Sequence, residues 1–140
     1  MAAKNKNVNL DRAGRSELHY AVVDRNLERV KELVRQGMDV NLADRNGWTA
    51  LHFAAQNNDA ETARFLLDSG AAVDPKDNYG NTPLSTAVFN SRGNGELFEL
   101  LRQPGADAES ENKSGVSPVG LARTIGNYDI ARFFEDLGEE

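Results

Sequence analysis

Apolar residues recur along the chain in pairs of patches, and each patch has the spacing of a helix with one buried face. The first patch of a pair is short, as in residues 18–22 and 51–55, and the second is longer, as in residues 27–34 and 60–67. Apolar residues three and four positions apart lie on the same side of a helix. The pattern therefore predicts pairs of helices whose apolar faces meet in a shared core.

Turns that contain glycine separate these helix pairs at a nearly constant interval. Gly14, Gly47, Gly80 and Gly115 lie 33, 33 and 35 residues apart, and an Asp or Asn stands three positions before each of them. Asp and Asn open turns by bonding to nearby backbone N–H groups, and glycine supplies a positive φ. A Ser or Thr two positions after each glycine is a favourable helix N-cap. The glycines predicted to end the longer helices are Gly37, Gly70, Gly105 and Gly138.

This period and its motif resemble the ankyrin repeat, which is about 33 residues long and carries a Thr-Pro-Leu-His-x-Ala signature. The nearest match is the stretch Asp-Arg-Asn-Gly-Trp-Thr-Ala-Leu-His-Phe-Ala-Ala at residues 44–55. Corresponding residues recur four times in register between residues 11 and 138. The resemblance implies an all-α repeat solenoid, an ankyrin-like stack of helix-turn-helix units joined by β-turn or hairpin loops.

The expected organisation is an N-terminal tail, residues 1–10, and a single ankyrin-repeat domain, residues 11–140, with the first seven residues disordered. A solenoid needs polar outer faces on its terminal repeats. Repeat one has Glu32 where repeat two has Phe65, and repeat four has Arg123 where repeat three has Val88. These two repeats are therefore predicted to be N- and C-terminal capping repeats of a monomer. The four repeats are expected at residues 11–43, 44–76, 77–111 and 112–140.

Repeat three departs from the pattern in two places. Two extra residues fall within residues 90–95, where a longer surface loop costs little; the alternative is a loop that contacts a partner. Ser85 and Thr86 replace the His-Phe pair of repeat two, and repeat four has Gly120 in place of the histidine. The junction between the third and fourth repeats is therefore predicted to be the weaker one.

The composition narrows the functional classes. The chain has 22 acidic and 16 basic residues and a net charge of −6, which disfavours a nucleic-acid binder and a polybasic membrane anchor. It has no cysteine, which excludes disulfides and Cys-ligated metal sites. No apolar stretch approaches the ~18 residues of a membrane span, and the first residues form no apolar leader. A cytoplasmic protein is the expectation.

No catalytic pattern is present in the sequence. The two histidines, His19 and His52, occupy the same repeat position, where ankyrin-like repeats use histidine for a structural hydrogen bond near the helix start. Neither a phosphate-binding Gly-Lys-Ser/Thr loop nor a Gly-x-Ser-x-Gly nucleophile elbow occurs. We therefore expect no enzyme, no catalytic residue, no metal, no cofactor and no small-molecule substrate.

The resemblance implies a concave face built from the turn tips and the first helix of each repeat. Arginine and aromatic residues dominate binding hot spots, so Arg45, Trp48 and Tyr79 are predicted to form the centre of a protein-binding site. For Tyr79, packing on the next turn is an equal alternative; for Trp48, contact with the partner is favoured over packing. The predicted partner-binding residues are Arg12, Arg15, Arg45, Asn46, Trp48, Gln56, Asn57, Asn78, Tyr79, Asn81, Phe89, Asn90 and Lys113.

The charge of this face differs from that of the rest of the chain. Five basic and two acidic residues give the face a net charge of +3 and leave −9 for the remainder. A basic strip predicts a partner with an acidic patch, because complementary potentials steer association. The counted residues are Arg12, Arg15, Arg45, Lys76 and Lys113, with Asp24 and Glu111.

The sequence therefore predicts a non-catalytic protein–protein interaction module that binds a partner protein through its concave face. A stoichiometric inhibitor or immunity protein is the favoured form, since a small array acts mainly by occupying its partner. An adaptor or scaffold in a regulatory complex is the alternative. Nucleic-acid binding through the basic strip is the least favoured interpretation.

Overall fold

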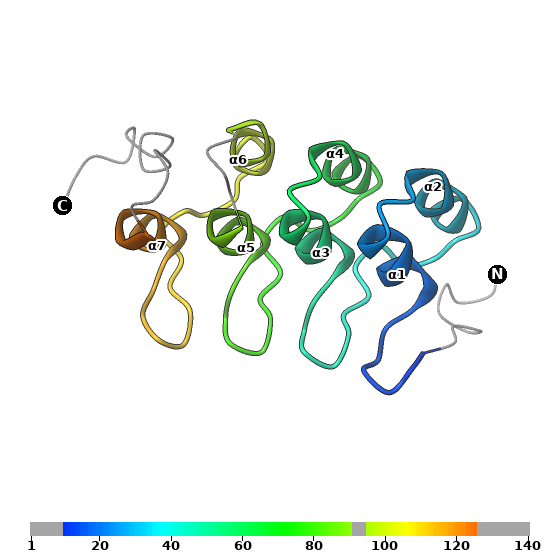
Figure 1. Ribbon diagram of the computed structural model, residues 1–140, viewed down its shortest axis with the longest axis horizontal. Helices are drawn as coiled ribbons and strands as arrows, with labels where there is room; N and C mark the ends of the chain where they lie inside the picture. The colour runs from blue at the N-terminus through cyan, green and yellow to red at the C-terminus, as the bar shows by residue number, and fades with distance from the viewer. Residues whose placement is uncertain (1–9, 91–94, 126–140) are drawn as a thin grey trace.

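The computed structural model of the chain describes residues 10–90 and 95–125, which hold seven α-helices and no strand. The helices are α1 (Glu17–Val23), α2 (Leu27–Arg35), α3 (Ala50–Gln56), α4 (Ala60–Asp68), α5 (Pro83–Phe89), α6 (Glu96–Arg102) and α7 (Pro118–Ile125). Helices α1, α3, α5 and α7 form one row, and α2, α4 and α6 form a second (Figure 1). The turns project from the first row, away from the second. The predicted all-α repeat solenoid is confirmed.

Three expectations concern residues outside the described ranges. They are the disorder of the first seven residues, most of the extra loop in repeat three, and the second helix of repeat four with its terminal Gly138. The repeat boundaries proposed from the sequence also stay predictions.

Polar caps and prolines begin the helices of the first row, as predicted. The Ser16 hydroxyl accepts hydrogen bonds from the backbone N–H groups of Leu18 and His19, at 3.2 and 3.4 Å. Helices α5 and α7 begin at Pro83 and Pro118, a position where the missing N–H costs nothing because it has no acceptor within the helix. These local signals fix where each first-row helix starts.

Glycines with positive φ end the helices of the second row. Gly37, Gly70 and Gly105 have φ values of 100°, 100° and 113°, a region that residues with a Cβ rarely adopt. The backbone N–H of each donates to a carbonyl in the last turn of its helix. Their predicted role as helix-ending caps is confirmed.

The core lies between the two rows of helices. Leu18, Leu51 and Leu84 from the first row are at most 1% exposed, and they join Leu66 and Leu101 from the second row in one continuous cluster. Burying each such side chain contributes about 1.5–3 kcal/mol relative to leaving it in water. Because this cluster is continuous, the packing of apolar side chains between successive repeats stabilises the stack.

Polar residues lie on the outside at the two ends of the described stack. Arg123 is exposed, whereas Val88 at the aligned position of α5 is fully buried. Glu32 is exposed as well, whereas the aligned Phe65 is half-buried against the core. Both placements are what a capping role requires.

Backbone hydrogen bonds join the tips of successive turns. Arg45 N donates to Ala13 O (2.7 Å), Asn78 N to Asn46 O (2.9 Å) and Lys113 N to Tyr79 O (2.9 Å). The tips approach so closely that a Cβ on Gly47 would lie 2.8 Å from Asp77 Cα. The tips thus form a ladder with a fixed spacing.

Each histidine links the start of its own helix to a backbone carbonyl in or just before the turn of the next repeat. His52 Nδ1 accepts a hydrogen bond from the Thr49 N–H (3.1 Å), so the neutral ring carries its proton on Nε2, which donates to the Asn81 carbonyl (3.0 Å). His19 Nδ1 accepts from the Ser16 N–H (2.9 Å) in the same way, but its Nε2 donates to the carbonyl of Leu42 (2.9 Å), which lies just before the turn of repeat two. The predicted structural role of both histidines is confirmed.

Repeat three has Ser85 at this position and makes no such bridge within the described residues. The Ser85 backbone N–H is held by the Thr82 hydroxyl of its own repeat (3.4 Å). The weaker junction between the third and fourth repeats stays a prediction, and the missing histidine bridge is its physical basis.

A buried carboxylate oxygen lacks a partner at the junction of repeats two and three. Asp74 Oδ2 accepts a hydrogen bond from Asp107 N (2.9 Å), but its Oδ1 is buried without one in the described structure. At the aligned position, Asn41 uses both ends of its amide: Oδ1 accepts from Ala72 N (2.8 Å) and Nδ2 donates to Gly70 O (3.4 Å). Burial raises the pKa of the Asp74 carboxyl.

We expect acidification to destabilise the fold through its two histidines. Burial lowers the pKa of His19 and of His52 below the ordinary value of 6.5, because the charged ring would be desolvated. Above that value the rings are neutral in both the folded and the unfolded chain. As the pH falls below it, the unfolded chain takes up protons first and stability is lost. The urea midpoint of unfolding should therefore fall from pH 7.5 to pH 5.

The matched control is His52→Ser, which carries the residue that repeat three has at this position. At pH 7.5 it should be less stable than the wild type by about 1–3 kcal/mol, because its partners lose their hydrogen bonds. It should also lose less stability on acidification. Equal losses in the two proteins would show that His52 does not carry this pH dependence.

Asp74→Asn should stabilise the protein at pH 7 by about 0.5–1.5 kcal/mol, because the amide supplies a donor in place of the unpaired oxygen. The gain should shrink as the pH falls through the carboxyl pKa, since protonation then relieves the wild type. Asp68→Asn removes the same charge at an exposed site on α4. An equal gain in that control would attribute the effect to net charge instead.

Candidate functional site

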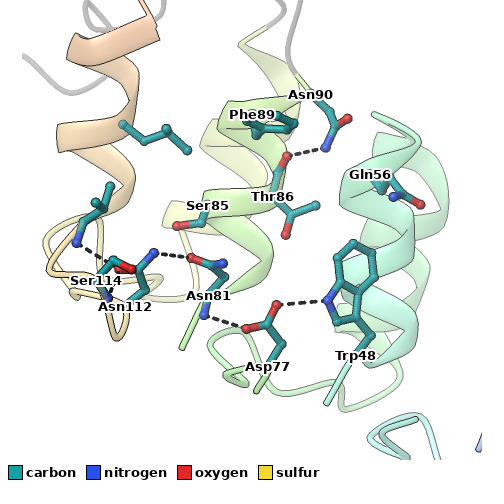
Figure 2. A pocket seen from close by; sticks show the side chains of 12 residues that line it. Trp48, Gln56, Asp77, Asn81, Ser85, Thr86, Phe89, Asn90, Asn112 and Ser114 are labelled. Atoms are coloured by element: carbon teal, nitrogen blue, oxygen red, sulfur yellow. Dashed lines mark hydrogen bonds between the residues drawn. The ribbon is translucent and has the colours of Figure 1, made fainter. Parts of the chain in front are cut away.

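A groove runs along α5 between α3 and α7 (Figure 2). Its volume is about 500 Å³. The described residues that line it are seven uncharged polar residues, four apolar residues and one charged residue, Asp77. The groove therefore combines hydrogen-bonding groups with apolar surface and carries little free charge.

Short side chains on α5 open this groove. Thr86 stands where α3 has Phe53, and Ser85 stands where α3 has His52. Both are buried, at 8% and 6% exposure, and both line the groove. The groove itself was not predicted, although these short residues were its visible signal in the sequence.

Asp77 connects its own turn to the preceding repeat. One carboxylate oxygen, Oδ1, accepts hydrogen bonds from the backbone N–H groups of Tyr79 and Asn81, both at 2.9 Å. The other, Oδ2, accepts a hydrogen bond from Trp48 Nε1 at 3.0 Å (Figure 2). Both oxygens are thus engaged within the stack.

The same contact recurs at the neighbouring junctions with different chemistry. The Arg15 Nε donates to Asp44 Oδ2 at 3.2 Å. In repeat four the turn opens with an amide, and Asn112 Nδ2 donates to Asn81 Oδ1 at 2.8 Å. The contacting residue of the preceding repeat is therefore a donor where the turn opens with Asp and an acceptor where the turn opens with Asn.

These contacts show that Trp48 and Arg15 pack within the stack, and their contact with a partner stays a prediction. The Trp48 ring is half-buried, stacks on His52 at 5.3 Å between centroids and lies 4.8 Å from the Phe53 ring. The Arg15 guanidinium lies 5.3 Å from the Phe53 ring as well as beside Asp44. Packing, the less favoured interpretation of Trp48, is what the structure shows, although one edge of its side chain still lines the groove.

Several predicted contact residues also use their amides within the stack. Asn57 Nδ2 donates to the carbonyls of repeat one, Asn78 Nδ2 donates to Arg45 O (2.8 Å), and Asn90 Nδ2 donates to Thr86 O (2.9 Å). Sequence alone did not separate these residues from free ones, because each bond crosses a junction or closes a helix end. Asn81 and Asn90 line the groove all the same.

The repeating units match a known family. A family model for ankyrin repeats, in three copies, matches residues 18–112. The chain belongs to the ankyrin repeat family. It matches no curated protein. Ankyrin repeats are generally protein–protein interaction modules, and catalysis is not their general role.

The remaining predicted residues of this ankyrin stack present their side chains to solvent. Tyr79 and Phe89 are 70% and 71% exposed, which is unusual for large aromatic residues in a folded domain. Tyr79 sits on the tip of repeat three, and Phe89 ends α5 at the groove. The other exposed members of the predicted set are Arg12, Arg45, Asn46, Gln56 and Lys113.

The charge of the ankyrin tips is more mixed than the sequence count indicated. The count omitted the carboxylates that open three turns, Asp11, Asp44 and Asp77. With these three included, the net charge of the set falls from +3 to zero. Arg45 and Lys113 remain exposed cations on their tips, so positive charge is local and does not form a continuous strip.

Two kinds of feature, a metal-binding cluster and a membrane-spanning helix, are absent from the described part of the chain. No group of three or more His, Cys, Asp or Glu side chains is placed to hold a metal ion there. No described helix is long and apolar enough to cross a membrane. The expected absence of a cofactor stays a prediction.

Trp48→Phe should destabilise the ankyrin stack by about 1–3 kcal/mol, because it keeps an aromatic ring but leaves the buried Asp77 Oδ2 without its donor. Urea unfolding at pH 7 measures this loss. Tyr79→Phe on the exposed tip is the control and should change stability by less than about 0.5 kcal/mol. A similarly small effect of Trp48→Phe would mean that the indole N–H does not hold the junction.

Proposed function

We propose that this ankyrin repeat protein binds a partner protein through its inner face, which we define as the surface of α1, α3, α5, α7 and their turn tips. The observation that carries the proposal is the exposure of Tyr79 and Phe89 beside the groove. Exposed aromatic residues of this kind supply most of the binding energy at protein interfaces.

The inner face is also held in one conformation before it binds. The tip ladder, the hydrogen bond from His52 to Asn81 and the contacts of Asp44 and Asp77 all cross the junctions between repeats. A surface that is already ordered loses little conformational entropy on association. Rigid presentation therefore supports binding of a folded or extended partner without rearrangement of the repeats.

The mode of action that we propose is inhibition by occupancy, as in a stoichiometric inhibitor or immunity protein. Binding through one face covers the partner's surface without any chemical step. Arg45 and Lys113 favour a partner with acidic residues next to its contact area. A monomeric state and a cytoplasmic location belong to this proposal.

The test is capture of the partner from native lysate by the wild type and by Arg45→Glu/Tyr79→Ala. This variant changes two exposed tip residues that lie outside the groove lining. It should bind the captured protein about tenfold or more weakly, which corresponds to about 1.4 kcal/mol. Arg35→Glu, at an exposed position of α2, is the matched charge reversal and should bind normally.

Equal binding by the wild type and the tip variant would place the interface elsewhere on the molecule. The partner's activity with and without the ankyrin protein then separates inhibition from an adaptor or scaffold role. A capture that consists of nucleic acid, with a steep dependence on salt, would overturn the proposal of a protein partner.

A further inference from the structure

The floor of the groove holds a hydroxyl that the stack does not use. Ser85 is 6% exposed, and its hydroxyl makes no hydrogen bond to the described part of the chain. In Figure 2 it is directed toward the α7 side of the groove. The oxygen is reached by solvent in the groove, since the buried unpaired oxygen of the described structure is that of Asp74, so the Ser85 hydroxyl is placed to bond to a ligand there.

Amides stand beside this hydroxyl. Gln56 is exposed on α3, and Asn81 has its Oδ1 occupied by Asn112 while its Nδ2 makes no hydrogen bond within the described residues. Side-chain amides and hydroxyls both donate and accept, as a peptide group does. This lining therefore suits the N–H and C=O groups of an extended peptide backbone.

Apolar side chains form the opposite part of the lining. Phe89 is 71% exposed and Val116 37% exposed, and both line the groove together with the half-buried Leu121. Their burial by a ligand would remove apolar surface from water at about 25 cal/mol per Å². A volume of about 500 Å³ lies within the range of about 300–1,000 Å³ that is typical of ligand sites.

The charged residues in and around the groove restrict which ligands can bind there. Among the described residues that line the groove, Asp77 alone is charged, and both of its carboxylate oxygens are occupied by Tyr79, Asn81 and Trp48. None of these described lining residues is basic, whereas Arg45 and Lys113 are exposed on tips outside the groove. A matching segment is therefore uncharged where it crosses the groove and acidic where it reaches the tips.

We propose that the groove between α3, α5 and α7 binds an extended peptide segment of a partner protein. The segment seats one apolar side chain against Phe89, Val116 and Leu121, bonds through its backbone to Ser85, Asn81 and Gln56, and carries an acidic residue toward Arg45 or Lys113. This inference rests on the proposed function and names the part of the partner that the inner face recognises.

The probe is a phage-displayed library of random peptides of about eight residues, which extend over roughly 27 Å. Selection is carried out on the wild type and on Thr86→Phe. That variant restores the residue that α3 carries at the aligned position, Phe53, and fills the groove without introducing a charge. Thermal unfolding verifies that each variant folds, and peptides enriched by the wild type are synthesised for affinity measurements.

The wild type should enrich peptides that share one apolar residue within an uncharged stretch and an acidic residue near one end. Their affinity should fall about tenfold or more in Thr86→Phe. Ser85→Ala should weaken binding about fivefold, as expected for one hydrogen bond. Ser69→Ala, at the C-cap residue of α4, which is not among the lining residues of the groove, should leave the affinity unchanged.

Three results would overturn the inference. Peptides that bind Thr86→Phe as tightly as the wild type do not occupy the groove. Selection without a shared apolar position means that the groove is not a peptide site. Self-association of the wild type that rises with concentration and disappears in Thr86→Phe assigns the groove to a second copy of this chain.

The partner captured by the inner face separates this inference from the proposed function. If that partner loses affinity for the tip variant Arg45→Glu/Tyr79→Ala but binds Thr86→Phe normally, the proposed function stands and the peptide groove fails. If it binds both variants normally, the inner face is not the interface and the proposed function fails as well.

Discussion

After the first turn, each turn of the stack opens with an Asp or Asn whose side chain bonds both to its own backbone and to the repeat before it. Asp77 closes its turn with one oxygen and accepts the Trp48 indole N–H with the other. Because one carboxylate makes both sets of bonds, the turn cannot change shape without loosening the junction. The tip ladder crosses the same junctions, and the hydrogen bond from His52 to Asn81 crosses the junction between repeats two and three. Both reinforce this coupling.

This constraint decides which side chains are left for recognition. Arg15 and Trp48 have the composition of hot-spot residues, yet both are engaged across the junctions that they span. The side chains of Tyr79 and Phe89 are instead largely exposed to solvent. The ankyrin framework therefore presents a small set of exposed residues on a surface whose spacing is already fixed.

The short residues of α5 that open the groove also leave repeat three without the histidine bridge. Ser85 replaces a histidine that would have bridged to repeat four, and Thr86 replaces an aromatic ring that would have filled the space. A native protein can carry lower local stability where a binding site requires it. We interpret the groove between α3, α5 and α7 as such a trade-off between stability and binding.

The sequence by itself determined the repeat, its helices and their ends, because glycine conformation, helix capping and apolar spacing are local properties of a few neighbouring residues. It also indicated the structural histidines, while for Tyr79 it left packing and partner contact as equal alternatives. It did not determine how Trp48 and Arg15 pack. Their contacts depend on Asp44 and Asp77, which stand in the next repeat and meet them only when the repeats stack. The groove was likewise decided by the tertiary structure, because a short side chain becomes a cavity only when larger neighbours surround it.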